Sequence, residues 1–128
     1  MDNENNIKYS FEHLETWQKA HEFILLTYKY SEVFPKTETF GLTSQFRRAA
    51  VSIAANIAEG YKKTGKADKL RFYNISQSSL EECRYYILLA RDLNYIPTEI
   101  SNILTVAIEI TSKLLNNYYR AIEKSIDK

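Results

Sequence analysis

Basic side chains concentrated in the middle of the chain are the residues best suited to bind a ligand. Between residues 41 and 80 the net charge is +5, whereas the part before it carries −3 and the part after it −1. Most of these charges flank Gly65, and Tyr61 and Tyr73 are close to it in sequence. Lysine and arginine neutralise phosphates, and tyrosine rings stack on bases. The candidate nucleic-acid-binding residues are therefore Arg47, Arg48, Lys62, Lys63, Lys66, Lys69 and Arg71.

The same charges admit a second interpretation, a solvated basic face that binds nothing, and the sequence leaves both open. A single cluster neutralises only a few phosphates, so its binding weakens quickly with salt unless the cluster is repeated around an oligomer. Arg47 and Arg48 can instead pair with carboxylates between subunits. Because no recognition-helix motif is visible, we expect contact with the RNA or DNA backbone rather than base-specific binding.

Polar residues recur at helical spacing in two successive stretches, along one side of each. An unpaired polar group costs about 1–3 kcal/mol when it is buried. We therefore expect the two stretches to form neighbouring helices whose polar stripes face each other. Hydrogen bonds between the stripes would then fix the register of these helices. The functional alternative is a ligand pocket that uses Asn56, Glu59 and Glu82. The residues of the two stripes, which we call the polar motif, are Gln45, Ser52, Asn56, Glu59, Gly60, Ser79 and Glu82. Ser76 lies on the second stripe as well.

The patterns of common catalytic and metal sites do not occur in the sequence. A ferritin-like di-iron site needs Glu-x-x-His on two helices, and neither His13 nor His21 has a glutamate three residues before it. Cys83 falls on an expected core stripe without a catalytic histidine beside it, which favours an inert thiol over a nucleophile. No Gly-x-Ser-x-Gly, glycine-rich phosphate loop or His-Glu-x-x-His is present. We expect no metal, no cofactor and no enzymatic activity.

Composition places the chain among proteins with one folded core. Its 128 residues are 45% hydrophobic, 13% aromatic and 26% charged, enough for a single domain that needs no disulfide or metal. The one cysteine excludes an intrachain disulfide, and no apolar run approaches the ~20 residues of a membrane span. The first nine residues are polar and unlike a signal peptide. We expect a cytoplasmic protein without a membrane partner.

Long stretches without helix breakers predict the fold. The chain has only 3 Gly and 2 Pro, and between them apolar residues recur at steps of three and four. This pattern predicts helices at residues 11–33, 40–61, 67–93 and 98–124, with a disordered polar N-terminus at 1–10 and a tail at 125–128. Long helices with short connections must pack antiparallel. The predicted fold is therefore all-α, a single-domain, up-down-up-down four-helix bundle.

The apolar stripes also predict which face of each helix is buried. In the first helix the predicted core stripe is Leu14, Trp17, His21, Ile24 and Tyr28. In the fourth helix it is Ile100, Ile103, Leu104, Ala107, Ile110, Leu114, Tyr118 and Ile122. The fourth helix carries further apolar residues off this stripe, such as Val106, Ile108 and Leu115. This surplus suggests that another subunit covers one of its faces.

A string of residues through the first three predicted helices resembles a known family. In chain order it consists of Trp17, Phe34-Pro35-Lys36-Thr37-Glu38, Gly41-Leu42, Gln45, Arg47-Arg48, Ser52-Ile53, Asn56-Ile57-Ala58-Glu59-Gly60 and Ser79-Leu80-Glu81-Glu82. The string is similar to that of the four-helix-bundle proteins encoded within intervening sequences of bacterial 23S ribosomal RNA genes. The resemblance extends from Phe11 to about Ile122.

The resemblance implies a four-helix bundle that assembles as a ring-shaped homopentamer and carries no catalytic residues. The accessory variability proteins of diversity-generating retroelements look like relatives, and they imply a basic oligomer that binds nucleic acid and a reverse transcriptase. Two functions follow as expectations. One is contact with RNA or DNA through the basic surface, and the alternative is a scaffold that binds a partner protein such as a reverse transcriptase without touching nucleic acid.

Overall fold

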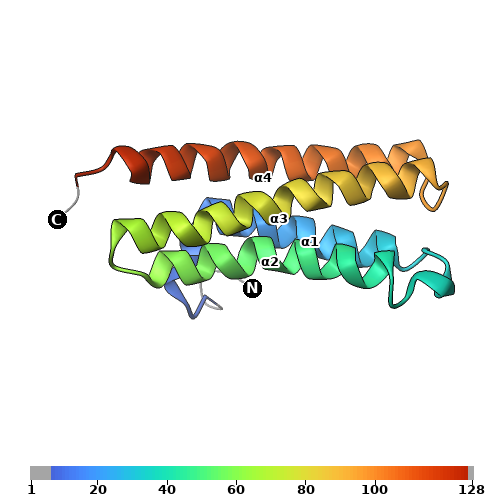
Figure 1. Cartoon of the computed structure of the whole chain (residues 1–128), viewed down its shortest axis with the longest axis horizontal. Helices are drawn as coiled ribbons and strands as arrows, with labels where there is room; N and C mark the ends of the chain where they lie inside the picture. Colours follow the sequence, from blue (N-terminus) through green and yellow to red (C-terminus); the bar gives the residue numbers. More distant parts are fainter. Residues whose placement is uncertain (1–6, 127–128) are drawn as a thin grey trace.

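Four long helices make up almost all of the protein (Figure 1). The structure is a computed structural model that describes residues 7–126, and within these residues it contains no strand. The long helices are α1 (Glu15–Ser31), α2 (Leu42–Lys62), α3 (Lys66–Asp92) and α4 (Thr98–Lys124), and two short 3-10 helices are η2 (Ser10–His13) and η3 (Lys36–Glu38). They form one compact domain, so the prediction of an all-α, four-helix, single-domain protein is confirmed.

The start of the first helix differs from the prediction. Where one helix is expected over residues 11–33, the chain forms η2, then an extended residue at Leu14 (φ −80°, ψ 118°), and only then α1. The expected disordered segment 1–10 and tail 125–128 lie partly outside the described residues. Of their described parts, Ser10 begins η2, and the Ser125 hydroxyl donates to the Ile122 carbonyl at 2.6 Å.

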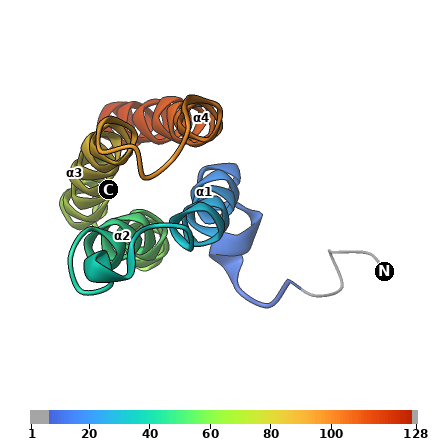
Figure 2. The same cartoon turned by 90° about the vertical axis from the view of Figure 1, so that its right-hand side faces the viewer.

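The helices lie side by side with their axes nearly parallel to the long dimension of the molecule (Figures 1 and 2). α2 packs on α3 and α3 packs on α4, while α1 contacts both α2 and α4. In Figure 1 the chain reverses direction at each connection between the long helices. The α2–α3 connection and the end of α4 therefore lie at the same end of the molecule.

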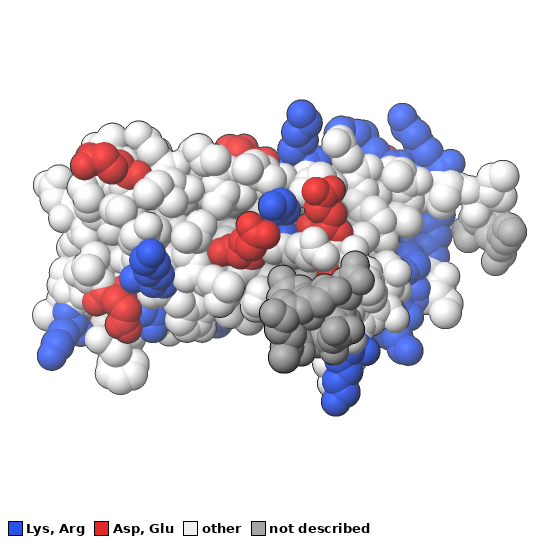
Figure 3. Space-filling model, turned by 180° about the vertical axis from the view of Figure 1, so that it is seen from behind, with Lys and Arg blue, Asp and Glu red and all other residues white. Residues whose placement is uncertain are grey.

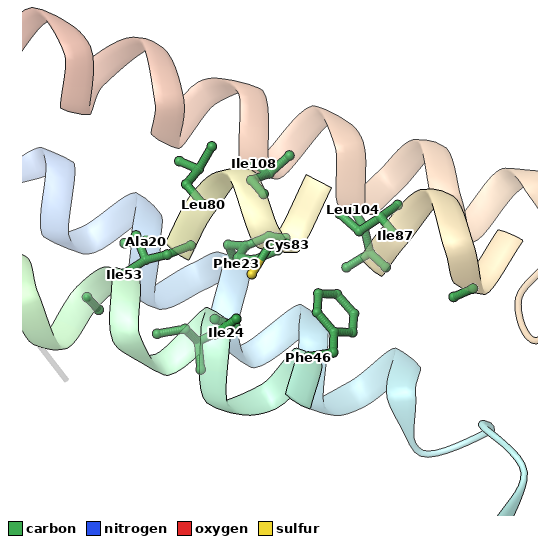
Figure 4. Close-up of a cluster of buried hydrophobic side chains, with 14 of the residues drawn as sticks. Ala20, Phe23, Ile24, Phe46, Ile53, Leu80, Cys83, Ile87, Leu104 and Ile108 are labelled. Atoms are coloured by element: carbon green, nitrogen blue, oxygen red, sulfur yellow. The ribbon is translucent and has the colours of Figure 1, made fainter. Parts of the chain in front are cut away.

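The core draws side chains from all four helices (Figure 4). Phe23 of α1, Phe46 and Ile53 of α2, and Leu104 and Ile108 of α4 are completely buried. α3 contributes Leu80, Cys83 and Ile87 between them. Burying a side chain of this size stabilises the fold by about 1.5–3 kcal/mol, which makes this cluster the main support of the bundle.

The buried faces of α1 and α4 agree only in part with the apolar stripes that the sequence predicts. Ile24 and Leu104 are buried, and most of the other predicted residues pack at the edge of the core. His21 and Tyr28 of α1 are exposed, and in α4 Ile103 and Ile110 are 41% and 44% exposed. Small hydroxyl residues lie inside in their place, among them Thr16, Thr27, Ser31, Ser101, Thr111 and Ser112. Thr111, for example, donates to the Ala107 carbonyl in its own helix at 3.0 Å. Because such a residue can satisfy its hydroxyl locally, it can lie in a core that apolar periodicity does not mark.

Gly60 allows α2 and α3 to approach closely near their connection. A Cβ atom added at Gly60 would lie 2.5 Å from Cε1 of Tyr73, which is closer than two carbon atoms can come. The Tyr73 ring is completely buried and packs against the Tyr118 ring, with centroids 5.1 Å apart. The ring cannot easily move aside, so this position requires glycine.

Glu38 joins the two connections at the other end of the bundle. Its Oε1 accepts a hydrogen bond from the backbone N–H of Leu42 at 3.0 Å, and its Oε2 accepts one from the Tyr95 hydroxyl at 2.7 Å. These bonds, the one from Leu42 first, lower the pKa of the Glu38 carboxyl below its ordinary value. The carboxylate therefore caps α2 and holds the α3–α4 connection against it.

We predict that Gly60→Ala destabilises the protein by about 1–3 kcal/mol, because the added methyl group overpacks the α2–α3 contact. The expected sign is the reverse of the ordinary gain of about 0.5–1 kcal/mol for this change inside a helix. Urea denaturation measures the loss. A double-mutant cycle with Tyr73→Leu identifies the cause, since removing the ring must relieve most of the penalty. An unchanged penalty in that background would contradict the explanation.

Glu38→Gln is expected to lower stability at neutral pH, and the deficit is expected to shrink in acid. A carboxyl whose pKa is lowered in the folded protein stabilises it above its ordinary pKa of 4.5. This contribution disappears as the pH falls through the lowered pKa, where wild type and variant become alike. Denaturation curves of both proteins between neutral and acidic pH measure the difference. A deficit that is constant over this range would show that the charge is not the cause.

Candidate nucleic-acid interface

Basic side chains from two distant parts of the sequence meet at one end of the bundle. The Lys66 ammonium donates to the Ser125 carbonyl at 2.7 Å and so ties the start of α3 to the residue after α4. Figure 3 shows the lysine and arginine side chains gathered around this end, on the right of the view. We call this surface the basic end and define it by Lys62, Lys63, Lys66, Lys69, Arg71, Arg120 and Lys124.

Lys69 has a structural role at the basic end. Its ammonium donates to the carbonyls of Gly60 at 3.1 Å and Tyr61 at 2.9 Å, in the last turn of α2, where intrahelical partners run out. Its Nζ also lies 5.5 Å from the centre of the Tyr61 ring. Burial lowers the pKa of Lys69. Lys69 therefore caps α2, and its partly buried ammonium group is already bound to two carbonyls.

Lys63 and Arg71 share the ring of Phe72. The Lys63 Nζ lies 5.2 Å and the Arg71 Cζ 4.5 Å from the ring centre, so each cation is held by its attraction to the ring. Each also approaches a carboxylate, Glu59 at 4.0 Å and Asp68 at 3.7 Å. Such exposed pairs hold their partners weakly. Both cations thus lie beside the Phe72 ring at the surface and can exchange these carboxylates for a phosphate.

Arg47 and Arg48 do not belong to this cluster. The Arg47 guanidinium lies over the Tyr28 ring at 4.6 Å and donates to the Ser31 hydroxyl at 2.8 Å and the Tyr28 carbonyl at 3.3 Å. Its Nη2 is also 3.6 Å from Glu32. Arg47 therefore fastens α2 to the last turn of α1 within one chain. Arg48 is exposed one residue further along α2, towards the end of the bundle opposite the basic end.

Sequence reasoning missed Arg120 and Lys124 as members of the basic end. Both are exposed in the last turns of α4, about 50 residues after the cluster in the sequence. The expected alternation of helix directions contains the signal that could have found them. A fourth helix that returns along the bundle ends where the second one ends, so its last turns and the α2–α3 connection must be neighbours.

The polar stripes of α2 and α3 meet over part of their length. The Ser79 hydroxyl donates to the Ser52 hydroxyl at 2.8 Å, and the Ser76 hydroxyl donates to the Ile53 carbonyl, also at 2.8 Å. Asn56 donates to the carbonyl and the hydroxyl of Ser52, at 2.8 and 3.0 Å, and so bonds within its own helix. These bonds hold the two helices in register.

The remaining members of the polar motif lie at its edges. The Tyr86 hydroxyl is 3.2 Å from Oε1 of Gln45 and 3.4 Å from Oε2 of Glu82, so it links these two side chains at the surface. Glu59 lies near Lys63 and is 14 residues along α2 from Gln45, far from the Tyr86 hydroxyl group. The structure therefore does not bring Asn56, Glu59 and Glu82 together as one ligand site between α2 and α3.

Other candidate groups lie apart from any reactive arrangement. Cys83 is completely buried, and burial raises the pKa of its thiol. His21 is exposed and stacks on Trp17 with ring centres 4.9 Å apart. Across residues 7–126, no three His, Cys, Asp or Glu side chains are grouped as metal ligands would be. No helix in this part of the chain is both long and apolar enough to span a membrane.

Comparisons with known proteins agree with this architecture. One solved structure superposes with a TM-score of 0.75 at 24% identity over 82% of this chain and 95% of its own. It is described as a protein of unknown function from the S23 ribosomal protein family of Bacteroides thetaiotaomicron. No curated protein matches the sequence. Residues 12–117 match the family model of the 23S rRNA-intervening sequence protein, and the chain belongs to that family.

Proposed function

We propose that this protein is a non-enzymatic, oligomeric bundle whose basic end binds the phosphate backbone of RNA or DNA. The observation that carries the proposal is the Lys66–Ser125 hydrogen bond, which places the cations of α4 beside those of the α2–α3 connection. Cations gathered on one surface attract a polyanion more strongly than the same number spread evenly. An RNA partner also agrees with the names of the family and of the structural neighbour, which refer to ribosomal RNA and to a ribosomal protein.

The cations of the basic end divide into those that build the surface and those that can reach a phosphate. Lys69 and Lys66 are bound to backbone carbonyls. Lys62 and Lys124 are exposed, and each is the last residue of its helix, α2 and α4, so a phosphate backbone that crosses this end can contact both. Such contacts carry no base preference and weaken with salt.

Charge reversal at Lys62→Glu with Lys124→Glu is expected to weaken binding to a labelled RNA or DNA by at least about tenfold at moderate salt. The slope of log affinity against log salt should also become shallower by about two, because each lost phosphate contact removes close to one released counterion. Fluorescence anisotropy across a salt series measures both quantities.

The matched control is Lys29→Glu with Lys36→Glu, which makes the same charge change at exposed positions away from the basic end. The control should keep the slope of the wild type. Equal effects of the two double variants would contradict a localised interface. If neither variant alters the binding, the basic end is not the interface. If the wild type binds neither RNA nor DNA even at low salt, the scaffold function, with a partner protein such as a reverse transcriptase, becomes the better account.

We further propose that a second copy of the chain covers an apolar face formed by α1 and α4. The residues that remain exposed there are Ile103 (41%), Val106 (61%) and Ile110 (44%). A groove of about 210 Å³ runs along this face, with Lys19 and Glu22 at its edge. An exposed apolar strip with a polar edge is typical of a subunit interface. Repetition of the contact closes a ring such as the homopentamer that the family resemblance implies, and it multiplies the basic ends.

Val106→Glu is expected to dissociate the oligomer, because it places an unpaired charge in the proposed interface. Light scattering should give a mass several times the 15.0 kDa of the chain for the wild type and close to 15.0 kDa for the variant. Val33→Glu is the control, because Val33 is similarly exposed (67%) and lies in the α1–α2 connection. A monomeric wild type at micromolar concentration would refute the assembly and the avidity that depends on it.

A further inference from the structure

A groove of about 490 Å³ lies next to the basic end, between the segment before α1 and one face of α2. Its lining consists of Lys8, Tyr9, Ser10, Phe11, Ala55, Ala58, Glu59, Tyr61 and Lys62. The volume falls within the range of sites for small molecules, about 300–1,000 Å³. Lys62 belongs both to this groove and to the basic end, so the two surfaces are continuous.

One wall of the groove is held by Glu12. The Glu12 Oε1 accepts hydrogen bonds from the backbone N–H groups of Lys8 at 3.0 Å and Tyr9 at 2.8 Å. These bonds, the one from Tyr9 first, lower the pKa of the Glu12 carboxyl. The side chain of Gln18 donates to the Glu12 carbonyl at 2.8 Å and so fixes the segment to the first turn of α1. The wall is therefore in place before a ligand arrives.

Aromatic rings form a continuous row behind this wall. The rings of Tyr9 and Phe11 lie nearly parallel at an angle of 6°, with centroids 5.7 Å apart, and Phe11 packs on Trp17 at 5.1 Å. Phe11 is partly buried, but Tyr9 remains 54% exposed. Phe11 supports the Tyr9 ring, and the Lys8 Nζ lies 5.6 Å from the ring centre, so a flat ligand would contact the exposed part of the ring beside this ammonium group.

The other wall comes from α2. Ala55, Glu59 and Lys62 follow one another at spacings of four and three, so they lie on one face of the helix. The two alanines at positions 55 and 58 leave room for a ligand. Tyr61, 37% exposed, adds a second aromatic surface to this wall.

The chemistry of this lining fits a nucleotide. Tyrosine rings stack on bases, the ammonium groups of Lys8 and Lys62 attract a phosphate, and the Glu59 carboxylate can accept a hydrogen bond from a base N–H. A carboxylate in the groove disfavours a ligand that is only an anion, such as free phosphate. We propose that the groove binds one nucleotide of a single-stranded nucleic acid, with its base against Tyr9 and Tyr61 and its phosphate at Lys62.

This inference rests on the proposed function, because the rest of the strand would continue over the basic end. The inference requires that the ligand carry bases, whereas phosphate contacts alone require only negative charge. A single strand can unstack a base and place it in the groove, whereas heparin offers the same kind of charge without bases. Loss of the rings must therefore affect the two polyanions differently.

The test combines Tyr9→Ala with Tyr61→Ala and compares binding of a labelled oligouridine of about 12 nucleotides with binding of labelled heparin. We expect the oligouridine affinity to fall about tenfold and the heparin affinity to stay within a factor of two. Tyr9→Phe with Tyr61→Phe keeps both rings and should bind like the wild type. Tyr85→Ala, which removes an equally exposed tyrosine (57%) from α3, controls for the loss of any surface ring.

Three outcomes overturn the inference. Unchanged oligouridine binding by the double alanine variant shows that the groove takes no base. An equal loss of heparin affinity shows that the rings support the fold or general charge binding rather than a base. A lowered melting temperature of the variant would show that they support the fold. A wild type that binds neither polyanion refutes the proposed function and this inference together. A wild type that binds both polyanions, with either of the first two results in the variant, refutes the inference alone.

Discussion

Much of the arrangement of this bundle follows from the close contact between α2 and α3 near Gly60. Gly60 leaves space for the buried ring of Tyr73, and the Ser76 hydroxyl bonds the Ile53 carbonyl two helical turns away. With the two helices this close and in fixed register, the chain needs only the three residues between Lys62 and Lys66 to reverse direction. The reversal concentrates basic residues around a tight turn.

The same contact determines which of the cations hold the fold and which face solvent. Because α2 ends beside the first turn of α3, Lys69 reaches the last carbonyls of α2 and its charge is used internally. Lys66 reaches across to α4 and draws the end of that helix to the turn. Lys62 and Lys124, the last residues of α2 and α4, remain exposed at the surface. Structural cations thus arrange the exposed ones, which explains how a protein with a net charge of only +1 can carry a localised basic surface.

The sequence predicts the helices better than it predicts their faces. Scarcity of glycine and proline and the regular apolar steps suffice for four helices, but Leu14 interrupts the first because Glu12 caps the segment before it. Part of the buried face of α4 escapes prediction, because hydroxyl residues such as Thr111 lie there where apolar ones are expected. Of the basic residues, Arg47 proves to join α1 to α2, a role that depends on a residue 16 positions away. Arg120 lies at the basic end because α4 packs beside α3. Local sequence patterns do not show which distant residues come together in this way.

Lysine footprinting can show whether the α2–α3 connection and the end of α4 form one nucleic-acid interface. The protein is acetylated with and without bound RNA or DNA, and the modification of each lysine is measured by mass spectrometry. The account predicts that Lys62 and Lys124 are protected together, while Lys29 and Lys36, which are exposed away from the basic end, react as before. Protection of Lys62 without Lys124, or equal protection of all four lysines, would contradict it.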